Sequence, residues 1–172
     1  ALPILFIENS LLEKEFTSPD EIKIHLDQYP GMVHWIDIRG LGNKHFLEKF
    51  GEMFGIIRLQ MEDVVNVYQR PKMEENMGYL FFISRLIGRQ DAVLQNDQLS
   101  IFLGKNYVIT FQECYEDVLD PVRNRIRHGK GSMRKSGPDY LAYSIMDAVV
   151  DNYYPVLDQI GERLDELQDE LL

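Results

Sequence analysis

A long helical pattern at the C-terminal end, over residues 138–172, constrains the fold more than any other feature of the sequence. Pro138 suits a first helical turn, because its fixed φ fits the helix and its missing N–H would have no partner there. Apolar residues then recur every three or four positions, which indicates one stripe along a helix and, from Leu157 onward, a heptad seam. The stripe consists of Met146, Val149, Tyr153, Leu157, Ile160, Leu164, Leu167 and Leu171. It reaches Leu172 without a Gly, Asn or Pro stop signal, so we expect one long helix that continues beyond this residue.

Pro155 lies inside this pattern. A proline in a helix interior either bends the helix or removes one hydrogen bond from it. The sequence does not decide between these two outcomes.

The charge of the chain is unevenly distributed, with a formal net charge of −10. This balance argues against nucleic-acid binding and leaves divalent cations or basic partners as binding candidates. Residues 121–137 hold six Lys or Arg and no acid, whereas residues 151–172 hold seven acids and one Arg. A basic stretch beside an acidic helix could be a phosphate or lipid-headgroup site. We interpret it instead as a solvated surface that makes ordinary ion pairs with its neighbour.

Composition sets the remaining bounds. A chain of 172 residues with 45% hydrophobic residues is long enough for one domain with a real core. Its single cysteine, Cys114, excludes a disulfide framework and favours a reducing compartment, the cytoplasm. The sequence has no apolar run of the ~18–20 residues that a membrane span needs.

The rest of the chain alternates strand-like and helix-like patterns. Helices are predicted at residues 17–28, 44–54, 59–67 and 117–128. Strands are predicted at residues 3–7, 11–16, 32–38, 72–75, 78–87, 98–103 and 107–112. We expect residues 89–96 to be a polar connection. The predicted fold class is α/β (α+β): a mixed β-sheet packed between helices over residues 1–137, followed by a helix over residues 138–172.

The sequence shows no arrangement of residues typical of an enzyme. It lacks the phosphate-binding loop, the dinucleotide fingerprint, the nucleophile elbow and the zinc-protease motif. The histidines, His25, His34, His45 and His128, are scattered along the chain and are interpreted as surface or sheet residues. We therefore expect a protein that is not an enzyme.

Acidic pairs are the remaining candidates for a binding site. Glu62 and Asp63 are adjacent on a predicted short helix, and Asp147 and Asp151 lie one turn apart on the long one. Asp147 is flanked by apolar residues, so its carboxylate needs a cation, a hydrogen-bond donor or a metal ion. A salt bridge to an arginine of the same chain satisfies this need as well as a metal does.

A series of short motifs follows in one order along the chain. They are Gly55-Ile56, Leu59, Glu62-Asp63, Asn66, Gln69-Arg70-Pro71-Lys72, Tyr79-Leu80-Phe81, Gln98-Leu99-Ser100-Ile101, Lys105-Asn106-Tyr107-Val108, Phe111-Gln112-Glu113, Asp120-Pro121-Val122-Arg123, Asp139-Tyr140-Leu141, Tyr143-Ser144 and Asp147-Ala148. Together these motifs resemble the N-terminal domain of the CorA-type magnesium transporters. The resemblance covers about residues 33–172, and no single motif decides it.

This resemblance implies a part of a homopentameric channel that moves Mg²⁺, with Co²⁺ or Ni²⁺ as further ions. A cytoplasmic α/β domain, here residues 1–137, leads into a stalk helix that begins at residue 138. The stalk leads in turn to two membrane helices, with a Gly-Met-Asn sequence at the pore mouth. The domain would then lie at the cytoplasmic face of the inner membrane.

The resemblance also implies regulatory Mg²⁺ sites between neighbouring subunits. Asp63 matches the principal carboxylate of these sites, and Glu62 and Asp147 match its companions. Asp151 is a secondary acidic contributor, and the family's opposing stalk carboxylate would lie beyond Leu172. Two alternatives remain: a zinc or other transition-metal transporter of the same superfamily, and a stand-alone coiled-coil interaction module.

Overall fold

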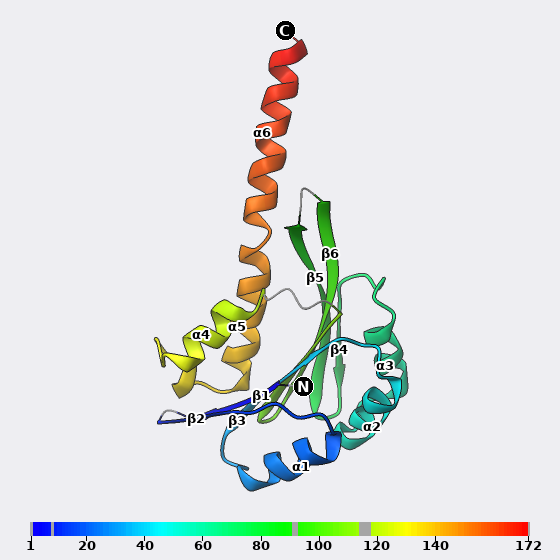
Figure 1. The fold of residues 1–172 in the computed structure, drawn as a ribbon, viewed down its shortest axis with the longest axis vertical. Coiled ribbons are helices and arrows are strands. Elements are labelled where there is room, and N and C mark those ends of the chain that lie inside the picture. Colours follow the sequence, from blue (N-terminus) through cyan, green and yellow to red (C-terminus); the bar gives the residue numbers. More distant parts are fainter. Residues whose placement is uncertain (1, 8, 91–92, 114–117, 172) are drawn as a thin grey trace.

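The computed structural model describes residues 2–7, 9–90, 93–113 and 118–171 (Figure 1). The single cysteine, Cys114, lies outside these ranges. The centre of the fold is a seven-stranded sheet with the order β2-β1-β3-β7-β6-β5-β4. The strands are β1 (Leu2–Ile7), β2 (Ser10–Glu13), β3 (Val33–Arg39), β4 (Lys72–Asn76), β5 (Tyr79–Gln90), β6 (Val93–Gly104) and β7 (Tyr107–Gln112). β3 and β7 run parallel and the other neighbouring pairs run antiparallel, so the sheet is mixed as predicted.

Helices cover both faces of this sheet, which confirms the predicted fold class (Figure 1). The helices are α1 (Pro19–Gln28), α2 (Lys44–Phe54), α3 (Arg58–Val65), α4 (Asp120–Arg127), the 3₁₀ turn η1 (Met133–Lys135), α5 (Pro138–Asp151) and α6 (Tyr154–Leu171). Successive strand residues point to opposite faces. Trp35 of β3 therefore packs with the α4–α5 layer, and Ile36 packs with the α1–α3 layer.

The predicted polar connection at residues 89–96 is wrong. β5 and β6 form one long hairpin whose ladder runs from the pair Tyr79–Gly104 to the pair Gln90–Val93. Backbone pairing satisfies the polar groups of a two-stranded ribbon whatever its side chains are, so side-chain polarity does not mark the end of a strand. Arg85 reinforces the ribbon: its guanidinium donates to the side chain and the backbone carbonyl of Asn96, each at 2.7 Å.

The helix expected over residues 138–172 is interrupted at residues 152–153. Pro155 lies in the first turn of α6. In an uninterrupted helix its ring would clash with the backbone carbonyl four residues earlier, so the break before it avoids this clash. The carbonyl of Tyr153 accepts instead from the amides of Val156 and Leu157, at 3.1 and 3.0 Å. The turn is held against β5, because the Tyr153 hydroxyl donates to the carbonyl of Arg85 at 2.6 Å and the Asn152 amide donates to that of Ile87.

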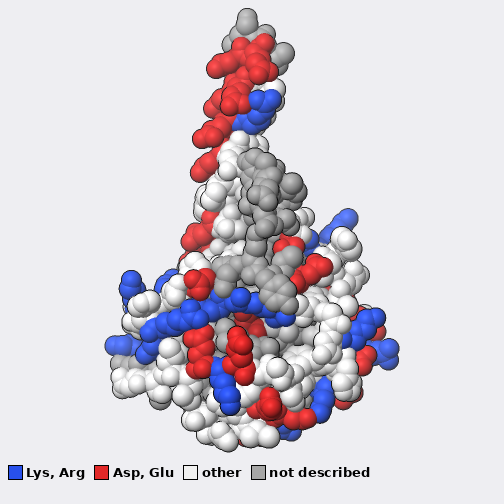
Figure 2. Space-filling model, viewed as in Figure 1, with Lys and Arg blue, Asp and Glu red and all other residues white. Residues whose placement is uncertain are grey.

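α5 packs on the sheet, while α6 projects away from the body of the molecule (Figure 1). Acidic side chains follow α6 along the face seen in Figure 2. The described residues leave its apolar stripe largely uncovered, since Leu157, Ile160 and Leu164 are all more than half exposed. None of the described helices is long and apolar enough to cross a membrane. The predicted boundary at residue 137, between a sheet domain and the beginning of a stalk helix, stays a prediction.

Candidate metal site on helix α3

Close contact with α2 fixes the position of α3. Gly55 ends α2 in the left-handed region at φ 64°, which turns the chain toward α3. A Cβ atom on Gly51 of α2 would lie 2.9 Å from Cγ of Met61, so a larger side chain there would push the helices apart. With Met61 and Val64 buried in the core, Glu62 is left on the outer surface and Asp63 meets strand β4.

Asp63 is a largely buried carboxylate with a cationic partner in its own chain. Lys72 on β4 places its Nζ 2.6 Å from Oδ2 of Asp63 and 2.7 Å from Oε1 of Glu74. One ammonium group therefore bridges two carboxylates. The hydrogen bonds to Asp63 and Glu74 raise the pKa of Lys72 above its usual value, which keeps the ammonium group charged at neutral pH.

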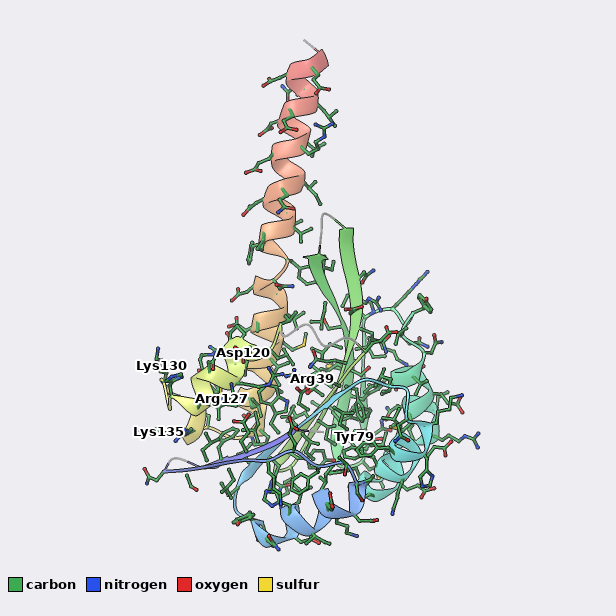
Figure 3. All side chains as sticks on the ribbon, viewed as in Figure 1. Arg39, Tyr79, Asp120, Arg127, Lys130 and Lys135 are labelled. Atoms are coloured by element: carbon green, nitrogen blue, oxygen red, sulfur yellow. The ribbon has the colours of Figure 1, made fainter. Side chains whose placement is uncertain are left out.

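Polar side chains around this bridge hold the Glu74 carboxylate and the backbone of Asp63 in place. Nε2 of Gln60 donates to Oε2 of Glu74 at 2.9 Å, and the hydroxyl of Tyr79 donates to Oε1 of Gln60 at 2.7 Å. The hydrogen bond from Gln60, followed by that from Lys72, lowers the pKa of Glu74. Figure 3 shows Tyr79 beside the α2–α3 side of the sheet. The backbone carbonyl of Asp63 accepts from Nε2 of Gln98 at 2.9 Å, which ties α3 to β6.

Glu62 faces solvent and is only loosely held. Its carboxylate accepts from Nε of Arg58 at 3.2 Å, an i,i+4 pair on an exposed helix face. Such pairs contribute about 0.3–0.5 kcal/mol. Glu62 also borders a cavity of about 330 Å³ between α2 and α3, with Leu47 and Met61 among its apolar lining residues. Its carboxylate is therefore free to reorient toward an ion or a neighbouring molecule.

The structure does not bring Asp147 and Asp151 to the Asp63 site within one chain. Both lie on α5, which packs on the sheet face opposite to α3. Asp147 is half-buried and Asp151 is exposed. Among the described residues neither has an ion-pair partner, so an arginine of the same chain does not neutralise Asp147 there. The described residues also contain no cluster of three or more His, Cys, Asp or Glu side chains able to hold a metal ion.

Sequence reasoning missed Lys72 and Glu74 as neighbours of Asp63. The sequence did indicate that Lys72 and Glu74 are neighbours, because residues two apart on a strand lie on the same face of the sheet. The sequence could not show that α3 covers this face of β4. That depends on the packing of Gly51 against Met61.

The most deeply buried ion pair among the described residues lies away from α3, between the sheet and α4. Asp37 of β3 accepts from Nη2 of Arg123 at 2.8 Å, from the Thr110 hydroxyl at 2.7 Å and from the Gln112 amide at 2.9 Å. The Arg123 guanidinium also lies over the ring of Trp35, 5.3 Å from its centroid. Asp37 and Arg123 are each 1% exposed. Nε of Arg39 also lies 2.9 Å from Oδ2 of Asp37. This network joins α4 to the sheet.

The basic stretch at residues 121–137 is largely engaged within the chain. Arg127 pairs with Glu13 at 2.5 Å and with Asp120 at 3.4 Å, and Figure 3 shows Asp120 and Arg127 together beside α4. Arg134 donates to the carbonyls of Ile126 and Arg127, at 2.6 and 2.7 Å. These contacts agree with a surface that makes ordinary ion pairs. In the part of the chain that the structure describes, the acids paired with Arg123 and Arg127 include Glu13, Asp37 and Asp120.

Comparison with known proteins identifies the family. The family model described as CorA-like Mg²⁺ transporter protein matches residues 31–172. The chain belongs to this family. It is 42% identical over 140 residues to the cobalt/magnesium transport protein CorA of Thermotoga maritima, which covers 80% of this chain and 40% of that protein. The chain thus spans less than half the length of this relative. Its family is one of ion transporters, in agreement with the expectation that it is not an enzyme.

Solved structures with low sequence identity share the fold. The soluble domain of CorA from Methanocaldococcus jannaschii superposes with a TM-score of 0.72 at 18% identity, over 99% of this chain and 64% of that one. The full-length CmaX protein superposes with a TM-score of 0.79 at 14% identity, over 100% of this chain and 51% of that one. These likenesses show that the chain has the same arrangement of sheet and helices as the two structures.

Proposed function

We propose that this chain is the cytoplasmic, ion-sensing part of a longer protein that moves Mg²⁺, and also Co²⁺ or Ni²⁺, across the inner membrane. The observation that carries this proposal is the 42% identity to a protein named a cobalt/magnesium transport protein. If the full-length protein is instead a zinc or other transition-metal transporter, uptake assays would show transport of that ion rather than Mg²⁺. If the chain is a stand-alone coiled-coil module, the assays would show no transport.

In this proposal the full-length protein is a homopentamer. The exposed apolar stripe of α6 supports assembly, because side chains such as Leu157 and Leu164 gain burial only against another helix. The acidic face of α6 supports a role for cations in that assembly, because like charges brought together need counter-ions. The division at residue 137 would separate the sheet domain from the beginning of this shaft.

The proposed regulatory ions bind between neighbouring subunits. Asp63 is the principal ligand, Glu62 and Asp147 are its companions, and Asp151 contributes negative charge. The placement of α3 and α5 on opposite sheet faces supports a shared site, since Asp63 and Asp147 could meet one ion only from two different copies. Mg²⁺ suits such a site, because it keeps most of its waters and needs one or two carboxylates.

Gating then follows from electrostatics. Bound Mg²⁺ offsets the repulsion between the acidic faces of neighbouring subunits and favours a closed, symmetric ring. When the Mg²⁺ concentration on this side of the membrane falls, the sites empty, repulsion returns and the ring loosens. The ions therefore act on the pore through the packing of the subunits.

The test is Mg²⁺ protection of the full-length protein against limited proteolysis. In the Asp63→Ala variant the Mg²⁺ concentration for half-protection should rise by roughly tenfold or more, because even outer ligands of metal sites matter that much. Asp27→Ala is the matched control, an exposed aspartate on α1 that should leave protection unchanged. An unaltered digestion profile for Asp63→Ala would overturn the regulatory site.

A further inference from the structure

The Asp63 carboxylate already has a cation at the position where a metal ion would bind. Nζ of Lys72 lies within 2.7 Å of one oxygen of Asp63 and one oxygen of Glu74. The Lys72 ammonium also lies 5.7 Å from the centroid of the Phe81 ring, a further favourable contact for a positive charge. A divalent ion that approaches Oδ2 of Asp63 must therefore displace this ammonium group.

The two carboxylates do not depend on Lys72 alone for their placement. Glu74 is held by Gln60, which is itself held by the Tyr79 hydroxyl. Asp63 is held through its backbone carbonyl by Gln98. The Glu74 carboxylate is thus held by a neutral hydrogen bond and the backbone of Asp63 is anchored to β6. Removal of the ammonium group would leave two anionic side chains facing one position.

Lys72 is able to leave. Its side chain is 31% exposed, whereas that of Asp63 is 13% exposed, so the lysine approaches the pair from the solvent side. A flexible four-carbon stem allows the ammonium group to swing into water without any change in the backbone of β4. The buried partner of Asp37 differs in this respect, because the side chain of Arg123 is 1% exposed.

We propose that Lys72 is a built-in competing cation that occupies the Asp63 carboxylate in the metal-free state and weakens its affinity for divalent ions. This inference rests on the proposed function, in which Asp63 is a regulatory ligand. Its consequence is that the site responds only to high concentrations of a divalent ion, as a sensor of an abundant ion requires. Lys72 acts here as a competitor for the carboxylate and is not itself a metal ligand.

The first test measures Mn²⁺ binding to the 172-residue chain by electron paramagnetic resonance, because Mn²⁺ prefers the same oxygen ligands as Mg²⁺. Lys72→Met should bind Mn²⁺ roughly tenfold or more tightly than the unaltered chain, since two carboxylates then face one unfilled position. The double variant Lys72→Met with Asp63→Asn should lose this gain. Lys49→Met, which removes an exposed ion pair with Asp20 on another surface, is the matched control and should bind as the unaltered chain does.

Equal or weaker Mn²⁺ binding by folded Lys72→Met would overturn the proposal. If the repulsion between Asp63 and Glu74 prevents that variant from folding, nuclear magnetic resonance of the unaltered chain decides instead. On Mg²⁺ addition the side-chain carbon next to Nζ of Lys72 should shift together with the carboxyl carbon of Asp63, while the same carbon of Lys49 stays constant. Any result in which Lys72 does not respond overturns the competition.

These outcomes are separable from the failure of the proposed function. Suppose that Lys72→Met does not bind Mn²⁺ more tightly, but full-length Asp63→Ala loses its Mg²⁺ protection. These results would refute the competition by Lys72 and leave the regulatory role of Asp63 standing. The opposite pair of results would retain Lys72 as a local competitor and refute the regulatory role of Asp63.

Discussion

Asp37 and Asp63 are both carboxylates paired with a cation of their own chain, yet their surroundings give them different roles. Asp37 is buried with Arg123, also pairs with Arg39 and accepts further hydrogen bonds from Thr110 and Gln112, so a dissolved ion would have to displace several partners at once. Asp63 is largely buried, but the side chain of its partner Lys72 is 31% exposed, so water can solvate the ammonium group when it leaves the pair. Only the second environment permits exchange with a dissolved ion.

His34 should make the stability of the chain depend on pH. Burial lowers the pKa of its side chain from 6.5 to about 4, and its Nδ1 has no hydrogen-bond partner. The folded protein therefore keeps His34 neutral while the unfolded chain binds a proton below its ordinary pKa. Stability is present above pH 6.5 and is lost as the pH falls toward 4, with a loss of about 2 kcal/mol between pH 7 and pH 5.

Urea unfolding at pH 7 and pH 5 measures this loss. The His34→Gln variant should show a smaller difference between the two pH values, because its side chain does not titrate. A difference of the same size in His34→Gln would assign the pH dependence to other groups.

At these sites the sequence predicted residue types better than partners. The adjacent acids Glu62 and Asp63 were recognisable from their neighbours, and the apolar flanks of Asp147 predicted its partial burial. The contact of Asp63 with Lys72 was not predictable, because it depends on which helix covers the face of β4. The sequence also offered an arginine as partner for Asp147, and the described residues supply none.

At the scale of elements, local patterns located most helices and strands, and failed where the tertiary context decides. The helices predicted at residues 17–28 and 44–54 correspond to α1 (Pro19–Gln28) and α2 (Lys44–Phe54). The polarity of residues 89–96 was misleading, because pairing across the β5–β6 hairpin is independent of side-chain character. The apolar stripe of residues 138–172 concealed the break before Pro155, since the stripe continues across it.

The attachment of α4 to the sheet should depend on Arg123. The Arg123→Met variant leaves the buried Asp37 with the partly exposed Arg39 as its remaining cationic partner, so we expect the free energy of unfolding to fall by about 3 kcal/mol. Urea denaturation measures this loss. Arg125→Met on the same helix is the matched control and should change stability by less than about 0.5 kcal/mol. Equal effects of the two substitutions would show that the buried pair does not hold α4.

At the scale of the whole molecule, the chain consists of a packed body and a helix that leaves it. The body buries its apolar residues in two clusters, one on each face of the sheet. α6 instead keeps its apolar stripe and its acids exposed along its length. Such a helix gains stability when its apolar stripe packs against a helix of another subunit. The proposed sensor depends on the same packing, because its sites lie between subunits.

The most direct test of a divalent-ion site at Asp63 is a crystal structure of the full-length assembly grown with Mn²⁺, with anomalous scattering recorded to locate the ion. We predict an anomalous peak at the subunit boundary beside Asp63, with Lys72 turned away from the carboxylate, and no such peak in Asp63→Ala. Mn²⁺ bound elsewhere, with the Asp63–Lys72 ion pair intact in every subunit, would contradict the account.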